Sequence, residues 1–441
     1  MARGLVTPEK IRNLQRKLYA KAKSEPDFRF YSLYDKVHRA DILLHAYRLR
    51  RRKRGAAGVD GVTFEDIEAA GVEEWLRNLE TELREGSYQP QPVRRTMIPK
   101  ANGGQRPLGI PTVKDRVVQT AVLLVLQPIF EADFEENAYG YRPGRSAQDA
   151  VADVLTSVKQ GQGHVVDADL SKYFDTIPHC ELMKSVARRI SDRRMLHLIK
   201  MWLKVPVEEM DERGRKVLTG GKRAQRGTPQ GGVISPLLAN IYIHRLLRAW
   251  TKFDLQRLLG SRIINYADDL VIVFRSAGGA QAAHAWLRRI IEKLGLQLNE
   301  TKTCVRHART EGFNFLGFTF GPVFGRAGRK YLGVTPSKKA VDKAKQNLQA
   351  VLCPRNQDPL PEVIAQVNRR LVGWANYFSV GAVRPAYRAV DHYLYEQLRG
   401  FLKRRHKVPA RGTLRYNYRF LNQHGVVVLQ DRWRCASHAA A

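Results

Sequence analysis

The chain has 441 residues, and its 75 Lys and Arg residues against 42 Asp and Glu residues give a formal net charge of +33 at pH 7. This length indicates two or three domains, and a hydrophobic content of 44% excludes global disorder. No apolar run reaches the roughly 18 residues of a membrane span, and the scattered cysteines argue against a disulfide scaffold. So large a cationic excess favours an anionic partner, which makes nucleic acid the leading partner class.

The first part of the chain predicts helices followed by one hairpin. Residues 1–36 indicate a basic helical arm, and residues 31–54 indicate an amphipathic helix that ends in the basic run RLRRRKRG. That run fits either a solvated helix end or a phosphate contact. A further helix is expected at 71–85. The alternating pattern at 94–99, a glycine-containing turn and a second strand at 106–110 then predict a hairpin.

The middle of the chain alternates helical and strand patterns, which is typical of an α/β domain. The predicted elements are a helix at 113–130, a buried strand in the segment before Pro178, helices within 181–203, a polar hairpin at 204–222, an apolar helix at 236–250, two strands joined by a tight turn at 262–274, a helix at 280–294, and strands near 313–320 and 330–334. From residue 336 to residue 406 the pattern is helical and rich in Lys and Arg. We therefore expect the main domain boundary near residue 335.

Acidic residues in two separate segments indicate the chemistry. Asp268 and Asp269 lie between two apolar strands, where adjacent like charges are costly unless a cation compensates them. Taken alone, this motif also fits a polar turn. Asp169 ends the buried strand VVDAD, and together the three carboxylates would give the all-oxygen ligand set that Mg²⁺ prefers. Two such ions about 4 Å apart can activate a 3′-hydroxyl and stabilise a departing pyrophosphate, which suggests nucleotidyl transfer.

At these residues the chain resembles the reverse transcriptases, because several of their motifs occur in the expected order. The matching segments are IPK and RPLGIP within 98–111, YGYRPGRS at 139–146, Asp169 with Phe174 and Asp175, GTPQGG at 227–232, YADD at 266–269, LGL through Lys302 at 294–302, and FLG at 315–317. The segment LVGWANYF at 371–378 is similar to the maturase-specific region of bacterial group II intron proteins. The resemblance covers about residues 31–407.

The resemblance implies a right-hand polymerase fold, in which an α/β part forms fingers and palm and an α-helical part forms the thumb. The implied divisions are an N-terminal basic arm at 1–36, fingers at 37–164, a palm with the catalytic acids at 165–335, a thumb or maturase-specific (X) region at 336–407, and a basic tail with the place of a DNA-binding segment at 408–441. No HNH-type endonuclease motif follows, so second-strand cleavage is not expected.

The family pattern assigns metal ligands. The resemblance implies that Asp169 and Asp268 hold two Mg²⁺ ions, that Asp269 assists, and that the Leu170 carbonyl touches the ion on the nucleotide side. Asp175 also matches the pattern, but we expect it to brace the end of the strand and leave it out of the ligand set.

The same pattern assigns contacts to the incoming nucleotide. Phe174 would fill the space of a ribose 2′-hydroxyl and favour dNTPs, a role compatible with plain core packing. Lys100 and Arg106 flank the hairpin turn and would clamp the triphosphate, although without the resemblance a solvated hairpin tip would explain them better. Gln230 would contact the nucleotide or template, or simply belong to a loop that starts a helix. Lys302 would lie near the phosphates.

Basic and aromatic side chains of the C-terminal helices have separate expected roles. Lys338, Lys339, Lys343, Lys345, Arg369 and Arg370 are expected to grip the template–primer duplex. Trp374, Tyr377 and Phe378 have helical i, i+3, i+4 spacing, which favours core packing over base stacking.

The sequence thus predicts the Mg²⁺-dependent RNA-directed DNA polymerase of a group II intron, which also binds intron RNA to promote splicing and retrohoming. The expected partners are intron RNA, an RNA template–DNA primer duplex, target DNA and dNTPs, without a membrane. We expect a bacterial cytoplasmic location with nucleoid association during insertion, and the oligomeric state stays open between monomer and dimer. The alternatives are a splicing maturase without polymerase activity, which the intact acids argue against, and a domesticated reverse transcriptase in repair or phage defence.

Overall fold

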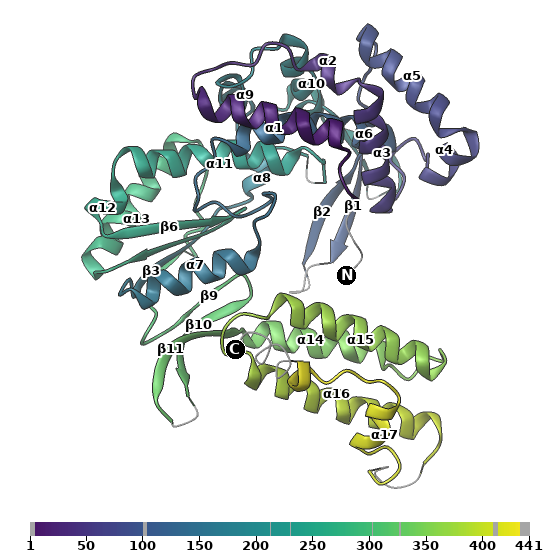
Figure 1. Ribbon diagram of the computed structural model, residues 1–441, viewed down its shortest axis with the longest axis vertical. Helices are drawn as coiled ribbons and strands as arrows, with labels where there is room; N and C mark the ends of the chain where they lie inside the picture. Colours follow the sequence, from purple (N-terminus) through teal and green to yellow (C-terminus); the bar gives the residue numbers. More distant parts are fainter. Residues whose placement is uncertain are drawn as a thin grey trace.

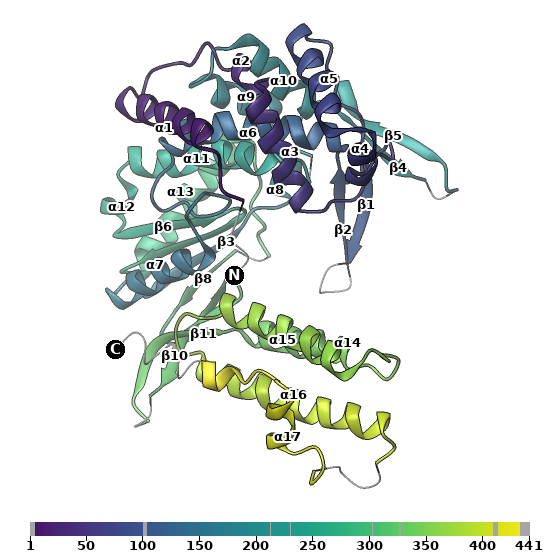
Figure 2. The same ribbon diagram turned by 45° about the vertical axis from the view of Figure 1, so that its right-hand side comes forward.

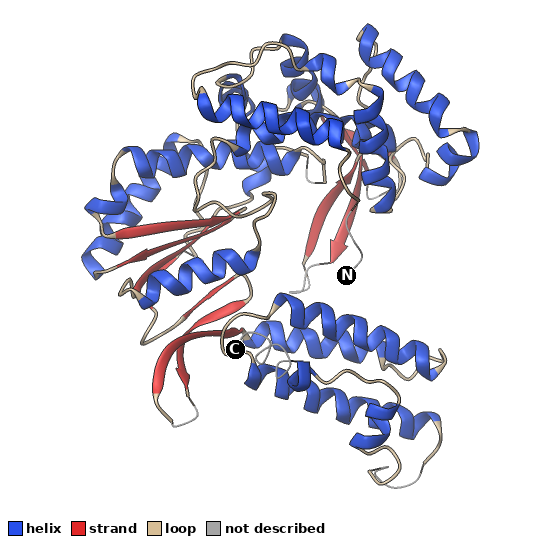
Figure 3. Ribbon diagram, viewed as in Figure 1, coloured by secondary structure: helices blue, strands red, loops and turns tan. Residues whose placement is uncertain are grey.

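The computed structural model describes residues 5–99, 104–211, 213–229, 231–301, 303–325, 328–408 and 413–432. A mixed α/β part comes first in the chain, and a helical part follows it (Figure 1, Figure 3). The change from mixed to helical structure comes after Pro336, which confirms the transition predicted near residue 335. In the described part of the chain, no helix combines the length and apolar composition needed to cross a bilayer.

The N-terminal helices pack around one central helix. They are α1 (Glu9–Ser24), α2 (Tyr34–Val37), α3 (Ala40–Arg52), α4 (Phe64–Ala70) and α5 (Val72–Glu85), and the central helix is α6 (Val113–Glu131). Helix α6 buries residues on all of its faces, as an apolar helix without a polar stripe should. Helix α1 of the predicted arm is therefore part of the main core, since its Ile11 and Leu18 are buried there.

The single helix expected at 31–54 is wrong, because two helices occupy this range. Helix α2 ends at Val37 and α3 begins at Ala40. The Asp192 carboxylate accepts hydrogen bonds from the backbone N–H groups of Leu33 and Tyr34, both at 2.8 Å. A distant acid therefore fixes where α2 starts, and the local pattern carries no sign of it.

One four-stranded sheet combines two hairpins of the chain. Its strands are β1 (Val93–Pro99), β2 (Gln105–Ile110), β4 (Pro206–Met210) and β5 (Lys216–Gly220), in the order β2-β1-β4-β5. Both predicted hairpins, 94–110 and 204–222, are present, and a short parallel pairing of β1 with β4 joins them. The domain boundary at residue 164 remains a prediction, and this sheet takes strands from both sides of it.

The second sheet carries the acidic motifs. It contains β3 (His164–Asp169), β6 (Ser261–Tyr266), β7 (Asp269–Phe274) and β8 (Cys304–His307) in the order β6-β7-β3-β8, with every pairing antiparallel. Alternate residues of β7 enter two different cores, with Leu270 and Ile272 on one side and Val271 and Val273 on the other. Burial on both faces explains the continuous apolar run LVIVF.

Helices cover both faces of this sheet. One face contacts α13 (Ala277–Lys293), and the other contacts α7 (Ala147–Lys159). Helices α9 (His179–Ala187), α10 (Arg193–Leu203) and α11 (Ser235–Lys252) join the first core. The described elements also include the short helices α8 (Tyr173–Thr176) and α12 (Leu255–Leu258) and a 3-10 turn at 221–223.

A small sheet connects the α/β part to the helical part. It consists of β9 (Phe313–Phe315), β10 (Phe318–Phe324) and β11 (Lys330–Pro336). Beyond it, α14 (Lys338–Val351), α15 (Leu360–Tyr377), α16 (Arg384–Arg405) and α17 (Tyr418–Gln423) enclose a core of their own. In both orientations of the ribbon, β1 runs toward α14 and α15 (Figure 1, Figure 2).

At the end of α15, Trp374 and Phe378 pack against the core, as their spacing predicts, whereas Tyr377 is exposed. Phe378 is buried, and its ring centroid lies 4.9 Å from that of Phe318 and 5.1 Å from that of Trp374. Tyr377 stacks on Phe318, and its hydroxyl donates to the Leu316 carbonyl at 3.0 Å. These contacts hold the C-terminal end of α15 against the small sheet.

We expect Asp192→Ala to destabilise the protein, because the same carboxylate also accepts from the N–H of Met195 at 3.1 Å and is itself buried. Loss of this acceptor leaves buried donors unpaired, which should lower the free energy of unfolding by about 3 kcal/mol. Urea unfolding followed by circular dichroism measures the change. Asp342→Ala, which removes an exposed acid on α14, is the matched control and should cost less than about 1 kcal/mol. Equal losses in the two variants would contradict this account of α2.

Candidate active site

The sheet register brings the two acidic segments together. Asp169 of β3 and Asp269 of β7 are direct partners in the antiparallel pairing. Directly opposed residues have Cα atoms about 4.5–5.5 Å apart and side chains on the same face. Asp268 precedes Asp269 in the tight turn between β6 and β7. Acids that are far apart in the sequence therefore meet at one corner of the sheet.

The three carboxylates of this corner fit a hard cation such as Mg²⁺, part of whose coordination shell the substrate would supply. Asp169 and Asp268 are half-buried, and Asp269 is exposed. Within the described ranges, no three His, Cys, Asp or Glu side chains form a ready-made metal-binding group. All the acids offer oxygen, and Mg²⁺ characteristically takes few protein ligands and completes its shell with water and phosphate. Leu170, the fourth predicted ligand, is buried and pairs with Leu298.

The turn that carries Asp268 is held in an unusual backbone conformation. Ala267 has φ of 58°, a region that residues with a Cβ seldom occupy. The side-chain amide of the buried Asn265 donates to the Ala267 carbonyl at 2.9 Å. On the other side, a Cβ on Gly140 would lie 2.3 Å from the Ala267 nitrogen, so only glycine fits there.

Residues 137–141 run alongside β6 and form a short parallel bridge with it. The Tyr139 N–H donates to the Asn265 carbonyl, and the Asn265 N–H donates to the Asn137 carbonyl, both at 2.9 Å. The Tyr139 hydroxyl donates to Asp153 at 2.8 Å, and the Asn240 amide donates to the Gly140 carbonyl at 2.7 Å. Burial and Asp153 together raise the pKa of Tyr139 to about 12, so this hydroxyl keeps its proton. The segment is anchored along its length.

This segment presents Tyr141 to the acids, and the sequence reasoning assigned Tyr141 no role of its own. Its φ is 58° and its side chain is 50% exposed. Its ring meets the edge of Phe174 with centroids 6.3 Å apart. Burial and the Asp268 carboxylate raise the pKa of Tyr141, whereas the Arg106 guanidinium lowers it, which shows that these groups share one electrostatic environment. The motif YGYRPGRS was the available signal.

Asn299 is a second residue that the sequence reasoning missed. Its side-chain amide donates to Asp169 Oδ2 at 3.0 Å, and its backbone N–H donates to the Asp169 carbonyl at 2.8 Å. The Ser171 N–H donates to the Gln297 carbonyl at 2.9 Å. Residues 297–299 therefore clamp the end of β3 and orient its carboxylate. The only sequence signal was their place within the matched segment 294–302.

Phe174 is set rigidly beside the acids. The chain turns sharply after β3, where Lys172 has φ of 46°, and α8 then places the Phe174 ring at 9% exposure. The Phe174 carbonyl accepts from the Thr228 N–H at 2.7 Å. The GTPQGG loop is thus fastened to the backbone of Phe174. Asp175 faces the same loop, because a Cβ on Gly227 would lie 3.0 Å from the Asp175 carbonyl oxygen.

The same loop also contacts β2 and α6. A Cβ on Gly231, whose φ is 105°, would lie 2.0 Å from the Gly109 carbonyl oxygen of β2. The Gln119 side chain of α6 accepts from the Val233 N–H at 2.7 Å. Glycine therefore allows the loop to lie directly on β2, which links the position of the hairpin to that of Phe174.

The structure places six of the predicted site residues in this region. Asp169, Leu170, Phe174, Asp268 and Asp269 surround the corner of the sheet, and Arg106 shares the electrostatic environment of Tyr141. Arg106 lies on β2 opposite Ile98 and is exposed. Lys100, Gln230 and Lys302 lie outside the described residues, so their assignments stay predictions.

Two known protein families match the chain, and together they cover most of its residues from 98 to 418. The reverse transcriptase (RNA-dependent DNA polymerase) family matches residues 98–320, and the group II intron maturase-specific domain matches residues 341–418. The first match covers about half of the chain and spans the acids, Phe174 and the GTPQGG loop. The second covers most of the helical part.

Individual relatives agree with these matches. Protein YkfC of Escherichia coli (strain K12) is 37% identical over 342 residues, which are 70% of this chain and 87% of YkfC. Group II intron-encoded protein LtrA of Lactococcus lactis subsp. cremoris is 30% identical over 355 residues, which are 66% of this chain but only 56% of LtrA. A solved telomerase structure from Candida albicans covers 80% of this chain and 67% of its own at 13% identity, and its TM-score of 0.42 is too low to support an argument.

The matches confirm the right-hand polymerase fold, with fingers, palm and thumb, that the motifs predicted. They also confirm the resemblance to group II intron-encoded proteins on which that prediction rested. The chain therefore belongs to the reverse transcriptases, and its helical part contains the maturase-specific domain of group II introns.

Proposed function

We propose that this reverse transcriptase polymerises DNA on an RNA template by a two-Mg²⁺ mechanism and serves a group II intron. The observation that carries the proposal is the pairing of Asp169 with Asp269, with Asp268 in the adjoining turn. Three acids at one corner of a protein with net charge +33 suit a cation-assisted reaction on nucleic acid.

Asp169 and Asp268 would hold the ions, with Asp269 and the Leu170 carbonyl assisting. Bound Mg²⁺ supplies activation of the primer 3′-hydroxyl and stabilisation of the departing pyrophosphate. The protein itself fixes the positions of the acids, because Asn299 holds the Asp169 carboxylate and Asn265 holds the turn. Such fixed carboxylates need little reorganisation during the reaction.

Phe174 would select deoxyribose. Its ring is nearly buried, its backbone is held by Thr228, and the Tyr141 ring closes one edge. A ring fixed in this way cannot move aside for a 2′-hydroxyl without disturbing the GTPQGG loop. Arg106 would neutralise the triphosphate together with Lys100, and Gln230 and Lys302 complete the proposed nucleotide contacts.

The helical part would hold the template–primer duplex and intron RNA. Lys338, Lys339 and Lys343 line an open cavity of about 610 Å³ with Asp342 as its one acid. This cationic lining at the start of α14 suits a phosphate backbone. The match to the maturase-specific domain supports binding of intron RNA, splicing and retrohoming as the wider role, with target DNA as a further partner. A bacterial cytoplasmic setting follows from this role.

A splicing factor without polymerase activity is the weaker candidate. All three acids are present, and the register brings them together. A protein that only bound RNA would have no need for adjacent carboxylates at an exposed corner of the sheet, where they repel phosphate.

Asp268→Asn should abolish primer extension while leaving RNA binding unchanged. The substitution removes a ligand charge that only the transfer step needs, so the rate should fall on the order of 10³-fold. The assay is extension of a DNA primer on an RNA template with dNTPs and Mg²⁺, and filter binding measures RNA affinity. Asp254→Asn is the control, because this exposed acid lies elsewhere and should keep full activity. A folded wild-type protein without product, or equal loss of binding and extension in Asp268→Asn, would refute the assignment.

Phe174→Ala should relax the choice between dNTPs and NTPs. Removing the ring opens space for the 2′-hydroxyl, so the preference for dNTP should fall by about tenfold or more. Single-nucleotide extension with dATP and ATP measures the ratio of kcat/KM values. Phe174→Tyr keeps the ring and should keep the preference. If the ratio is the same in Phe174→Ala and wild type, Phe174 serves core packing alone.

Asn299→Ala should weaken the response to Mg²⁺. Asp169 loses the donor that orients it, and loss of such a partner typically lowers metal affinity by about 10–100-fold. Primer extension over a Mg²⁺ titration should show a higher half-saturating concentration, with activity largely recovered at saturation. Asn78→Ala on the exposed face of α5 is the control and should follow the wild-type curve. An unshifted curve for Asn299→Ala would exclude this orienting role.

A further inference from the structure

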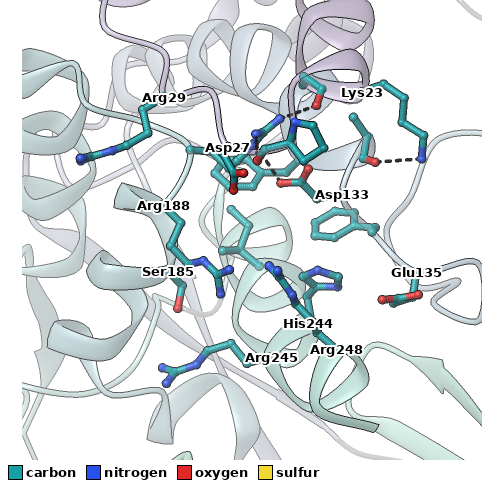
Figure 4. A pocket seen from close by; sticks show the side chains of 17 residues that line it. Lys23, Asp27, Arg29, Asp133, Glu135, Ser185, Arg188, His244, Arg245 and Arg248 are labelled. Carbon is teal, nitrogen blue, oxygen red and sulfur yellow. Dashed lines mark hydrogen bonds and ion pairs between the residues drawn. The ribbon is translucent and has the colours of Figure 1, made fainter. Parts of the chain in front are cut away.

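A cationic pocket of about 520 Å³ lies where the ends of several helices meet (Figure 4). Its walls come from the segments that follow α1 and α6, from the end of α9 and from one face of α11. We call it the arginine pocket and define it by Arg188, Arg245, Arg248 and His244. None of these residues belongs to the candidate active site.

Positive charge exceeds negative charge in this lining. Six basic residues line the pocket against three acidic ones, and they are Lys23, Arg29, Arg188, Arg189, Arg245 and Arg248 against Asp27, Asp133 and Glu135. Two of the arginines are neutralised locally. Arg189 pairs with Asp133 at 3.1 Å, and Arg245 pairs with Glu181 at 2.9 Å.

Of the other three arginines, Arg29 donates to the Ala187 carbonyl at 3.0 Å, which leaves Arg188 and Arg248. Among the described residues, Arg188 and Arg248 form no hydrogen bond or ion pair through their side chains. Figure 4 shows their guanidinium groups directed into the same space beside the His244 ring. Burial and the charges of Arg248 and Arg245 lower the pKa of Arg188, whereas Asp133 and Asp27 raise it, and the net lowering shows that repulsion and burial outweigh the attraction of the two acids.

The inner wall of the pocket is apolar and aromatic. The Phe134 ring meets His244 edge-on with centroids 5.6 Å apart, and Phe130 and Ile241 also line the wall. Burial, with Arg248, Arg188 and Arg142, lowers the pKa of His244 to about 4, so this ring is neutral at physiological pH. Its Nδ1 is buried without a hydrogen-bond partner among the described residues.

Helix ends alone do not explain this cluster. Arg188 follows the last residue of α9, and a positive charge there is stabilised by the negative C-terminal end of the helix dipole. Arg245 and Arg248 are different, because they lie at i and i+3 on one face of α11, where Glu181 pairs with Arg245 but Arg248 adds a second positive charge. The ligand-free protein therefore retains an unfavourable arrangement that an anion would relieve.

We propose that the arginine pocket binds a phosphate group, held between Arg188 and Arg248 with Arg245 at its edge. Guanidinium groups match phosphate oxygens in pairs of hydrogen bonds, and the aromatic wall suits an attached base or sugar. The phosphate would come from an RNA strand or from a free nucleotide. This site goes beyond the polymerase reaction, because Arg248 lies 13 residues along α11 from its start beside the GTPQGG loop, or about 20 Å at 1.5 Å per residue.

The test compares two doubly substituted proteins of equal charge. Arg188→Gln/Arg248→Gln changes the pocket, whereas Arg77→Gln/Arg275→Gln removes two exposed arginines elsewhere. Fluorescence anisotropy with a labelled RNA hairpin that carries no primer, measured over a salt series, tests the RNA source. Calorimetry with inorganic tripolyphosphate tests the free-phosphate source. Primer extension at saturating template–primer reports separately on the polymerase site.

For an RNA source we expect the pocket variant to bind the hairpin at least fivefold more weakly, with a salt slope smaller by about 1–2. For a nucleotide source we expect tripolyphosphate to bind the wild type and the control variant but not the pocket variant. In either case the primer-extension rate of the pocket variant should stay within about twofold of the wild-type rate. The outcome of this test is therefore independent of the outcome for the proposed polymerase site.

Two results would overturn the proposal. One is binding of both probes by the pocket variant at wild-type strength. The other is a fall in melting temperature for the pocket variant beyond that of the control, which would show that the arginines stabilise the fold. Arg188→Lys/Arg248→Lys keeps the charge without the paired hydrogen bonds, and it should bind with intermediate affinity.

Discussion

The register between β3 and β7 is the constraint on which the active site depends. It places Asp169 opposite Asp269, and a slip of one residue would turn every side chain of one strand to the other face. The apolar residues of β7 prevent such a slip, because alternate positions fill two different cores. Burial that stabilises the sheet thus also sets the spacing of the acids, so chemistry and stability share one set of contacts.

Close backbone contacts extend this constraint from the sheet to its surroundings. Gly140 lies against the turn that carries Asp268, and Gly231 lies against β2. In both places a Cβ would collide with backbone, which cannot move aside as a side chain can. The fingers, the GTPQGG loop and the acidic corner are therefore mechanically connected. A nucleotide that moves the β1–β2 hairpin would act on the position of Phe174 through Gly231 and Thr228.

The spacing of apolar residues predicted the helices and strands well, because each face of these elements is either consistently apolar or consistently polar. The hairpins at 94–110, 204–222 and 262–274 and the helix at 113–130 each follow from local alternation or apolar runs, and the motif order identified the family. The start of α2 at Tyr34 was not predictable, because the Asp192 carboxylate that accepts from the N–H groups of Leu33 and Tyr34 lies more than 150 residues away. Tyr141 and Asn299 were missed for the same reason, since the electrostatic influence of Asp268 on Tyr141 and the hydrogen bond from Asn299 to Asp169 exist only after folding.

Charge links the active site to the arginine pocket. With an excess of 33 positive charges, the folded chain repels itself, and local ion pairs such as Arg189 with Asp133 relieve only part of this. Acids are concentrated where a cation would have to enter, at the corner formed by Asp169 and Asp269. Arg188 and Arg248 share one pocket, where Asp27 and Asp133 offset only part of their charge. Both arrangements disfavour the isolated protein, and each becomes favourable when an ion of opposite sign binds, which is the physical reason for treating both as binding sites.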